Sequence, residues 1–334
     1  MSQEEITRVF EAFGQLRVLI IGDVMIDAYY YGKVSRISPE APVPIVSVVS
    51  KDQRLGGAAN VALNIKALGA KPILCATVGD DDHGTTFSKL LQQEGMSTAG
   101  IITNVNRPTT VKTRIISDSQ QMLRVDEEVT NELDADTSQK LGDRIEHLLD
   151  AEKVDVVIFE DYDKGVISAQ LIQRVVHACQ TRKIPVAVDP KRRNFTEYAG
   201  VTLFKPNLKE LREGLKIDLD QPNLENLQHA NAQLRLQLAH EMSLITLSER
   251  GVFVAANAEA QIFPAHLRSI ADVSGAGDTV ISVAALGLAL NLDPGFWAQL
   301  ANLAGGLVCE EVGVVPIDRD KLRSEALLLL AENN

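Results

Sequence analysis

The chain has 334 residues, of which 45% are hydrophobic, and its 33 basic and 45 acidic side chains give a formal net charge of −12. This length suits one large α/β domain or two smaller domains, and the apolar fraction is sufficient for a full core. The negative charge argues against a nucleic-acid-binding surface, which is normally basic, but it does not exclude an anionic small substrate bound by local cations.

The cysteines and the N-terminus indicate a cellular location. Cys75, Cys179 and Cys309 have no metal-ligand spacing, so we expect reduced, mostly buried thiols. The first residues lack the apolar core of a signal peptide. The longest apolar run, residues 280–290, is too short to span a bilayer. We therefore expect a cytoplasmic protein that does not enter a membrane.

Residues 16–22 form a short apolar run that ends in glycine, which is typical of a strand buried on both faces of a parallel sheet. Asp23 and Asp27 follow this run. Because open α/β sheets bind ligands beyond the carboxyl ends of their strands, both carboxylates are candidate ligands for substrate hydroxyls. The alternative is that they are turn and cap residues.

Two segments depart from the α/β pattern. Residues 29–50 are rich in tyrosine, proline and β-branched residues, and the prolines favour a sheet edge. Residues 108–126 have the pattern of a hairpin with a polar turn. Together the two segments predict a small β-sheet that forms a lid over the main sheet and excludes water from a transferring phosphate. An apolar surface on such a lid would also suit a homodimer contact.

Residues 56–65 begin with two glycines and continue with apolar residues at helical spacing. Gly56 and Gly57 would let a ligand approach the backbone closely, and Asn60 is placed to bind a sugar hydroxyl. Close packing of the helix on the sheet is the alternative. A buried strand over residues 72–79, a helix near 83–94 and a strand near 101 continue the α/β alternation.

The second half of the chain alternates strands and helices. We expect strands at residues 154–159 and 184–188 with a helix near 168–181 between them, which implies a parallel, doubly wound sheet. Asp161 follows the first of these strands. Lys191 lies in a basic loop after the second, where it would either meet phosphates or be solvated.

Asn207 and Glu210 have the spacing of a capping box. That explains both residues structurally and leaves a nucleotide or Mg²⁺ role open. Strands within 243–252 and 261–263 should pair antiparallel at one sheet edge. The remaining expected helices cover residues 280–290, 302–311 and 318–331. With no repeat or long linker, we expect a single domain over residues 1–334, with a lid formed by about 29–50 and 108–126.

The strongest chemical signal is the octapeptide from Asp272 to Thr279. Gly275, Ala276 and Gly277 would lie at the N-terminus of a buried helix, where amide N–H groups lack partners and the helix dipole favours negative charge. These amides would stabilise a moving phosphoryl group while Asp278 accepts the proton of the attacking hydroxyl. The alternative is a glycine-rich helix entry capped by an aspartate. The spacing matches neither a P-loop nor a dinucleotide fingerprint.

Residues 56–60 and 272–278 resemble the two signatures of the ribokinase-like (PfkB) family of carbohydrate kinases, and the match runs nearly end to end. The resemblance implies a ribokinase-like fold. Further runs resemble the heptose 7-phosphate kinases of this family, and residues 35–44 are the most specific; the others are 22–27, 161–165, 189–191 and 205–207.

The resemblance implies that ATP, with Mg²⁺, phosphorylates the anomeric C1 hydroxyl of D-glycero-D-manno-heptose 7-phosphate. The product would be the 1,7-bisphosphate, a precursor in ADP-heptose and lipopolysaccharide synthesis. Some relatives carry a fused nucleotidyltransferase domain. Because the sequence ends soon after the kinase, we expect that second activity to be absent.

The resemblance also implies a role for each site residue. Asp278 would be the catalytic base, and Gly275, Ala276 and Gly277 would form the anion hole. Asn207 and Glu210 would act on the magnesium-bound phosphates, and backbone carbonyls near Asp272 and Ser274 would hold a monovalent cation such as K⁺. The sugar would be held by Asp27, Gly56, Gly57 and Asn60, and the nucleotide by Lys191, Ser248, Gly251 and Asn302. Either Glu160 or Asp161 would lie near the sugar or the magnesium-bound phosphates, and we take Asp161 as the candidate sugar ligand.

The substrate phosphate requires cations, and spacing does not choose among five candidates, which are Arg36, Lys112, Arg114, Arg124 and Lys164. The chain also departs from its relatives, with Ser274 in place of the usual threonine and Glu160 in place of a small residue. These departures leave the exact sugar open. The alternatives are a PfkB kinase for another sugar and a non-catalytic sugar-phosphate or nucleotide sensor on a kinase scaffold. A third alternative is a dinucleotide-binding dehydrogenase, but the chain lacks the glycine fingerprint of that class after its first strand.

Overall fold

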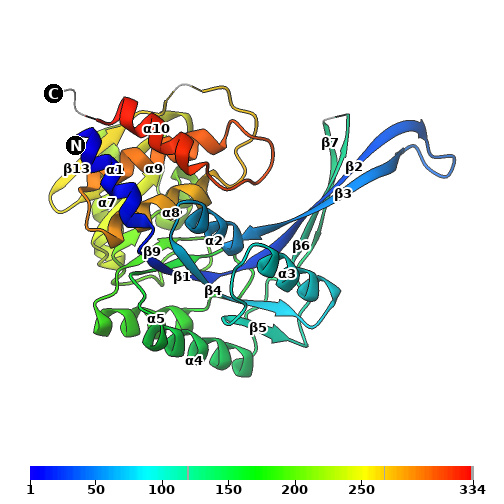
Figure 1. Ribbon diagram of the computed structural model, residues 1–334, viewed down its shortest axis with the longest axis horizontal. Helices are drawn as coiled ribbons and strands as arrows, with labels where there is room; N and C mark the ends of the chain where they lie inside the picture. Colours follow the sequence, from blue (N-terminus) through cyan, green and yellow to red (C-terminus); the bar gives the residue numbers. More distant parts are fainter. Residues whose placement is uncertain (119, 267, 332–334) are drawn as a thin grey trace.

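The computed structural model describes residues 1–118, 120–266 and 268–331. Within these residues, a nine-stranded sheet flanked by helices forms the body, and a separate four-stranded sheet projects from it as a long arm (Figure 1). The strand order of the large sheet is β13-β12-β11-β10-β9-β8-β1-β4-β5. Neighbouring strands from β11 to β5 are parallel, whereas β12 and β13 pair antiparallel at one edge. This is the expected mixed α/β class.

The first strand shows why the large sheet is buried on both faces. β1 (Arg17–Gly22) lies between β4 (Lys71–Gly79) and β8 (Val156–Glu160). Its side chains alternate between the faces, so Val18 and Ile20 join one hydrophobic cluster while Leu19 and Ile21 join another. The continuous apolar run in the sequence follows from this two-sided burial.

Helices cover each face of the large sheet. One face is covered by α1 (Gln3–Phe13), α2 (Ala58–Ala67), α3 (Asp82–Gln93), α8 (Ala276–Ala289), α9 (Pro294–Val308) and α10 (Arg319–Leu329). The other is covered by α4 (Ala135–Ala151), α5 (Ala169–Arg182), α6 (Leu208–Leu215) and α7 (Leu224–Leu238). The remaining strands are β5 (Ile101–Asn104), β9 (Val186–Asp189), β10 (Leu203–Phe204), β11 (Met242–Thr246), β12 (Val252–Ala256) and β13 (Glu259–Phe263). No helix of the described residues is long and apolar enough to cross a bilayer.

One helix boundary differs clearly from the sequence-based prediction. α9 begins at Pro294, so Asn302 lies in its middle and not near its start. The Asp293 side chain accepts a hydrogen bond from the Phe296 N–H, and proline is compatible with the first turn because its missing donor would have no partner there. The Asp293–Pro294 pair, and not the small residues from Asn302 onward, marks the start of this helix.

The four-stranded sheet has the order β3-β2-β6-β7. It is built from β2 (Val24–Ile37), β3 (Pro44–Gly57), β6 (Val111–Ser117) and β7 (Gln120–Glu127). Pro44 opens an edge strand, as the proline content predicted. β2 and β3 are longer than expected, because both extend into the body and end beside β1 and α2, as Figure 1 shows.

The two faces of the four-stranded sheet differ in chemistry. Strand register aligns Arg54, Asp27, Lys112 and Asp126 in one row across the sheet. Residues directly opposite one another share a face, so this face is polar. The alternate positions of β7 include Leu123 and Val125, which are 56% and 42% exposed. The second face is therefore apolar and partly open to solvent.

Candidate functional site

Asp278 lies in the first turn of α8, three residues after a glycine that has a left-handed backbone conformation. Gly275, the N-cap, has φ of 80°, a conformation that other residues rarely adopt. The amide of Thr279 closes the first helical turn on the Gly275 carbonyl. The amides just before it are those that a helix leaves without intrahelical partners. The prediction that residues 275–277 form the N-terminus of a helix is confirmed.

Two side chains from distant parts of the chain hold the Asp278 carboxylate. Asn60 Nδ2 donates to Oδ2 at 2.6 Å, and the Tyr162 hydroxyl donates to Oδ1 at 2.9 Å. Asp278 is only 4% exposed. Burial raises the pKa of Asp278 to about 6, although the two hydrogen bonds act in the opposite direction by favouring the charged form. At this pKa the Asp278 carboxylate is mostly ionised at neutral pH.

The two glycines before α2 bring the backbone against Asp27. A Cβ at Gly56 would come within 2.1 Å of Asp27 Oδ2, and Gly57 has φ of 62° as the N-cap of α2. The opposite side of the Asp27 carboxylate forms an ion pair with Arg114. Since Asn60 lies in the first turn of α2, the residues predicted to hold the sugar are contiguous with Asp278.

An acidic cluster also adjoins Asp278. Oxygens of Glu160, Asp189 and Asp278 all lie within 4.8 Å of one another. Both Glu160 oxygens and Oδ1 of Asp189 are buried and have no hydrogen-bond partner among the described residues. Burial, with further contributions from Asp189 and Asp278, raises the pKa of Glu160 well above its usual value. Lys205 Nζ offsets part of the charge at 2.7 Å from Asp189.

This donor set fits Mg²⁺, which prefers oxygen ligands and commonly uses one or two carboxylates together with substrate phosphates. The predicted magnesium residues lie close by. Asn207 and Glu210 form a complete capping box at the start of α6, as expected from the sequence. Glu210 also forms an ion pair with Lys191, with 2.8 Å between Oε1 and Nζ. Lys191 therefore joins the predicted nucleotide residues to the acidic cluster.

A large cavity opens on the other side of the α8 N-terminus. Its volume is about 960 Å³, which is within the range of small-molecule sites. The predicted residues that line it are Asn207, Ser248, Gly251, Ala276, Gly277 and Asn302. Gly251 has φ of 93° and ends the turn before β12. The cavity thus brings the predicted nucleotide residues to the amides of the α8 N-terminus.

The loop before α8 is held through the Asp272 side chain. Its Oδ1 accepts hydrogen bonds from the Ser274 N–H and hydroxyl at 3.0 and 2.8 Å. Its Oδ2 accepts one from the Gly313 N–H at 3.0 Å. The carboxylate thus ties the loop to itself and to Gly313, while the backbone carbonyls of Asp272 and Ser274 remain the cation ligands expected from the family resemblance.

Asp161 has a different environment from the one expected of a sugar ligand. It is 1% exposed, and its Oδ2 accepts hydrogen bonds from the Asn194 side chain and the Tyr198 hydroxyl. Its Oδ1 accepts the Asp163 N–H. Asp161 therefore organises the loop after β8, and we do not retain it as a sugar ligand. Its neighbour Tyr162 reaches Asp278 instead.

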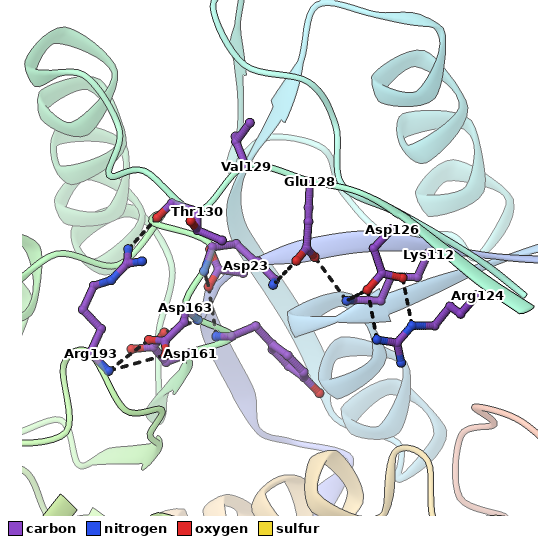
Figure 2. Close-up of polar contacts among 12 residues, drawn as sticks. Asp23, Lys112, Arg124, Asp126, Glu128, Val129, Thr130, Asp161, Asp163 and Arg193 are labelled. Atoms are coloured by element: carbon purple, nitrogen blue, oxygen red, sulfur yellow. Dashed lines mark hydrogen bonds and ion pairs between the residues drawn. The ribbon is translucent and has the colours of Figure 1, made fainter.

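Asp23 also organises this loop. Its carboxylate accepts hydrogen bonds from the N–H groups of Tyr162, Lys164 and Val166. Figure 2 shows Asp23 beside the loop that carries Asp161 and Asp163. Because its oxygens bind backbone amides, Asp23 is a structural residue, in agreement with the alternative given for it from the sequence.

The five candidate phosphate cations divide into two groups. Lys112, Arg114 and Lys164 are clustered: Lys112 and Lys164 share Glu128, and Arg114 pairs with Asp27. Arg124 lies opposite Arg114 in the register, but it is half-exposed and pairs with Asp126 on its own strand (Figure 2). These residues all lie on the polar face or at its base.

Arg36 is not near this cluster. It is exposed near the far end of β2, nine positions beyond Asp27. At about 3.3 Å per residue, that separation is roughly 30 Å. Within one copy of the chain, Arg36 and Asp27 therefore cannot contact the same sugar phosphate, and we do not retain Arg36 as a ligand in this site.

Several residues of the site escaped sequence reasoning. The family resemblance covers runs that contain Tyr162, Asp189 and Lys205 but implies no role for these three residues. For Glu160 it implies only that either this residue or Asp161 lies near the sugar or the magnesium-bound phosphates. Their position at the carboxyl ends of β8, β9 and β10 was the available signal, because neighbouring parallel strands end at the same sheet edge.

Comparison with known proteins places the chain in a family. Residues 15–320 match the family described as pfkB family carbohydrate kinase. The chain is 41% identical over 305 residues to the bifunctional protein HldE of Koribacter versatilis, covering 91% of this chain and 62% of the relative. It is 38% identical over 302 residues to HldE of Helicobacter pylori strain J99, covering 89% and 63%. The chain thus spans less than two thirds of the length of these relatives.

Solved structures show the same fold at much lower identity. Phosphofructokinase-2 from Escherichia coli in complex with potassium has a TM-score of 0.76 at 18% identity, covering 92% of this chain and 97% of that one. Arabidopsis thaliana ribokinase complexed with ribose and ATP has a TM-score of 0.71 at 17% identity, covering 92% and 98%. The ribokinase-like fold predicted from the sequence is confirmed. With the family match and the HldE similarity, the chain belongs to the pfkB family of carbohydrate kinases and is a sugar kinase.

Proposed function

We propose that this kinase transfers the γ-phosphoryl group of ATP to the anomeric C1 hydroxyl of D-glycero-D-manno-heptose 7-phosphate, giving the 1,7-bisphosphate. The observation that carries the proposal is the location of Asp278 between the start of α2, where the sugar is expected, and the large cavity, where ATP is expected. It bonds to Asn60 in the first turn of α2, and the adjacent Gly277 lines the large cavity. The heptose assignment is supported by the residue runs that resemble heptose 7-phosphate kinases and by the similarity to HldE proteins.

The proposed chemistry is an in-line displacement. Asp278 accepts the proton of the C1 hydroxyl while that oxygen attacks the γ-phosphorus. The amides of Ala276 and Gly277, at the positive end of the α8 dipole, stabilise charge on the transferring group. An anomeric hydroxyl is more acidic than an ordinary alcohol, so a carboxylate with a pKa of about 6 is a sufficient base.

ATP would occupy the cavity lined by Asn207, Ser248, Gly251 and Asn302. Its phosphates would lie toward Asn207 and toward Lys191, which pairs with Glu210 at the start of α6. Mg²⁺, when bound, would neutralise phosphate charge, and the carboxylates available to hold it are Glu160 and Asp189, with Glu210 acting through the phosphates or water. A monovalent cation such as K⁺ would bind carbonyls of the Asp272–Ser274 loop.

The sugar would lie between Asp278 and the base of the four-stranded sheet. We assign Asp27, Asn60 and the Gly56–Gly57 backbone to its hydroxyls. We assign the 7-phosphate to Lys112, Arg114 and Lys164, because these cations cluster around Asp27 and Glu128. Arg124, which is paired with Asp126, would take a peripheral part.

We infer that residues 1–334 act as one domain, with the four-stranded sheet as a lid over the sugar. The apolar face of this sheet, which exposes Leu123 and Val125, supports a homodimer formed through the lid. The three free, buried cysteines agree with a reducing, cytoplasmic compartment.

The test is a substrate panel with detection of ADP. Purified protein is incubated with MgATP and heptose 7-phosphate, fructose 6-phosphate, fructose 1-phosphate or ribose in turn. The proposal expects the highest kcat/KM for heptose 7-phosphate and a product phosphorylated at C1. Preference for another sugar would reject the heptose assignment while leaving the kinase intact. Binding of these ligands without any ADP release would favour the sensor alternative.

A further inference from the structure

Tyr162 contacts two residues of the site, Asp278 and Lys191, and the proposed chemistry assigns it no role. Its hydroxyl donates to Oδ1 of Asp278 at 2.9 Å, and its ring lies 5.3 Å from Lys191 Nζ. We propose that Tyr162 is a positioning residue that fixes the plane of the Asp278 carboxylate for attack by the sugar hydroxyl. This inference rests on the proposed role of Asp278 as the base, and it assigns a function to a residue on the opposite side of the site from α2.

The geometry explains why a second donor matters. Asn60 binds only Oδ2 of Asp278, and a carboxylate held through one oxygen can still rotate about its Cβ–Cγ bond. The Tyr162 hydroxyl binds the other oxygen, so the two donors together fix the orientation of the group. Each oxygen keeps a lone pair for the substrate proton, because a carboxylate oxygen can accept two hydrogen bonds.

Tyr162 is itself held firmly. Its N–H donates to Asp23 at 2.9 Å, and the N–H groups of Lys164 and Val166 donate to the same carboxylate. The preceding residue, Asp161, is fixed by buried hydrogen bonds. The loop that presents the tyrosine therefore has little freedom, which is what supporting contacts must supply if a catalytic group is to stay in place.

The tyrosine hydroxyl is the donor in this contact, because the ionised carboxylate of Asp278 can only accept hydrogen bonds. Tyr162 therefore supports Asp278 and does not replace it as the base. Loss of this hydroxyl should affect the orientation of the base without changing how either substrate binds.

The experiment compares Tyr162→Phe with a matched control, Tyr198→Phe. Both variants remove a tyrosine hydroxyl that donates to a carboxylate, but Tyr198 binds Asp161 and does not contact Asp278. For Tyr162→Phe we expect kcat to fall by about 10-fold, with KM for ATP and sugar within about twofold of the original values. For Tyr198→Phe we expect a lower melting temperature and a clearly smaller fall in kcat than for Tyr162→Phe, because this change loosens the loop but leaves the Tyr162 hydroxyl on Asp278.

Asp23→Asn provides a second route to the same measurement if Tyr162→Phe does not fold. It loosens the loop that carries Tyr162 and leaves the hydroxyl in place, so kcat should again fall while KM is retained. Equal kcat losses in Tyr162→Phe and Tyr198→Phe, an unchanged kcat, or a loss confined to KM would each overturn the inference.

Asp278→Asn is assayed in the same series, using the best sugar of the substrate panel. If Asp278→Asn retains turnover, the role of the base fails and the inference fails with it. If Asp278→Asn loses turnover while Tyr162→Phe keeps it, only the positioning role of Tyr162 is rejected.

Discussion

Asn60 and Asp278 are separated by 218 residues, and a hydrogen bond of 2.6 Å joins their side chains. Each residue belongs to one of the two signature segments, so the contact explains why those segments act together. The first turn of α2 and the first turn of α8 meet at this bond. The amide donor stabilises the ionised base in a buried position where charge is otherwise costly.

Replacing Asn60 by alanine tests this contact. Loss of the donor should raise the pKa of Asp278 above about 6, because the charged form loses a stabilising partner. The acid limb of kcat/KM should then move upward by about one pH unit. Asn64→Ala is the control, because Asn64 is buried on the same helix and binds Thr279 instead of Asp278. A similar shift in both variants would contradict the assignment.

The pH profile of kcat/KM for the unsubstituted enzyme should fall on its acid side near pH 6. Asp278 acts as a base only when ionised, so kcat/KM should fall by about tenfold for each pH unit below its pKa of about 6. The measurement is a pH profile of kcat/KM at saturating MgATP. An acid limb close to the ordinary pKa of an aspartate would show that burial does not raise the pKa of the group that controls the rate.

Glu160→Gln tests the acidic cluster through stability. The pKa of Glu160 is higher in the folded state than in the unfolded state. Glu160 therefore does not lower the stability of the fold at acid pH, where it is protonated in both states. Its contribution to stability falls as the pH rises above the pKa that it has in the unfolded chain. Without Mg²⁺, the variant should therefore melt higher than the original protein by roughly 2 °C at pH 8, with little difference at pH 4.5.

Added Mg²⁺ should narrow this difference at pH 8, because the original protein would gain more from the cation than the variant. Glu241→Gln, which replaces an exposed glutamate, serves as the control and should show neither effect. A stability difference that does not depend on pH would mean that the charge of Glu160 is not the cause.

The two arginine candidates for the substrate phosphate can be separated directly. Arg114 pairs with Asp27, whereas Arg36 is exposed near the far end of β2. Arg114→Ala should raise KM for the sugar phosphate by about 10-fold or more, because a charge-assisted contact is lost. Arg36→Ala should leave KM within about twofold of the original value. A comparable rise in both would indicate that Arg36 reaches the sugar, from the same copy or from a partner.

Much of this arrangement followed from local sequence patterns. The apolar run before Gly22 predicted β1, and the spacing of Asn207 and Glu210 predicted the capping box at α6. The apolar, small-residue run over 280–290 predicted a buried helix with residues 275–277 at its N-terminus, where α8 begins. These features depend on neighbours within a few residues, so they can be recognised in one dimension.

The contacts around Asp278 could not be obtained in that way. Tyr162 reaches it from the loop after β8, and that loop is held by Asp23, which lies between β1 and β2. Asp161 is a carboxylate at a strand end, as a sugar ligand would be, yet Asn194 and Tyr198 turn it inward. Such pairings arise from the crossover connections of the fold, which spacing along the chain does not reveal.

The most direct test of the central claim is the rate of ADP formation by Asp278→Asn with the best sugar of the panel. Asparagine keeps the shape of the side chain and removes the proton acceptor. We predict that kcat falls by about 10²- to 10⁴-fold, the usual contribution of a general base, while the melting temperature and ATP binding are retained. Near-original turnover in a folded variant would contradict the assignment of Asp278 as the base that starts phosphoryl transfer.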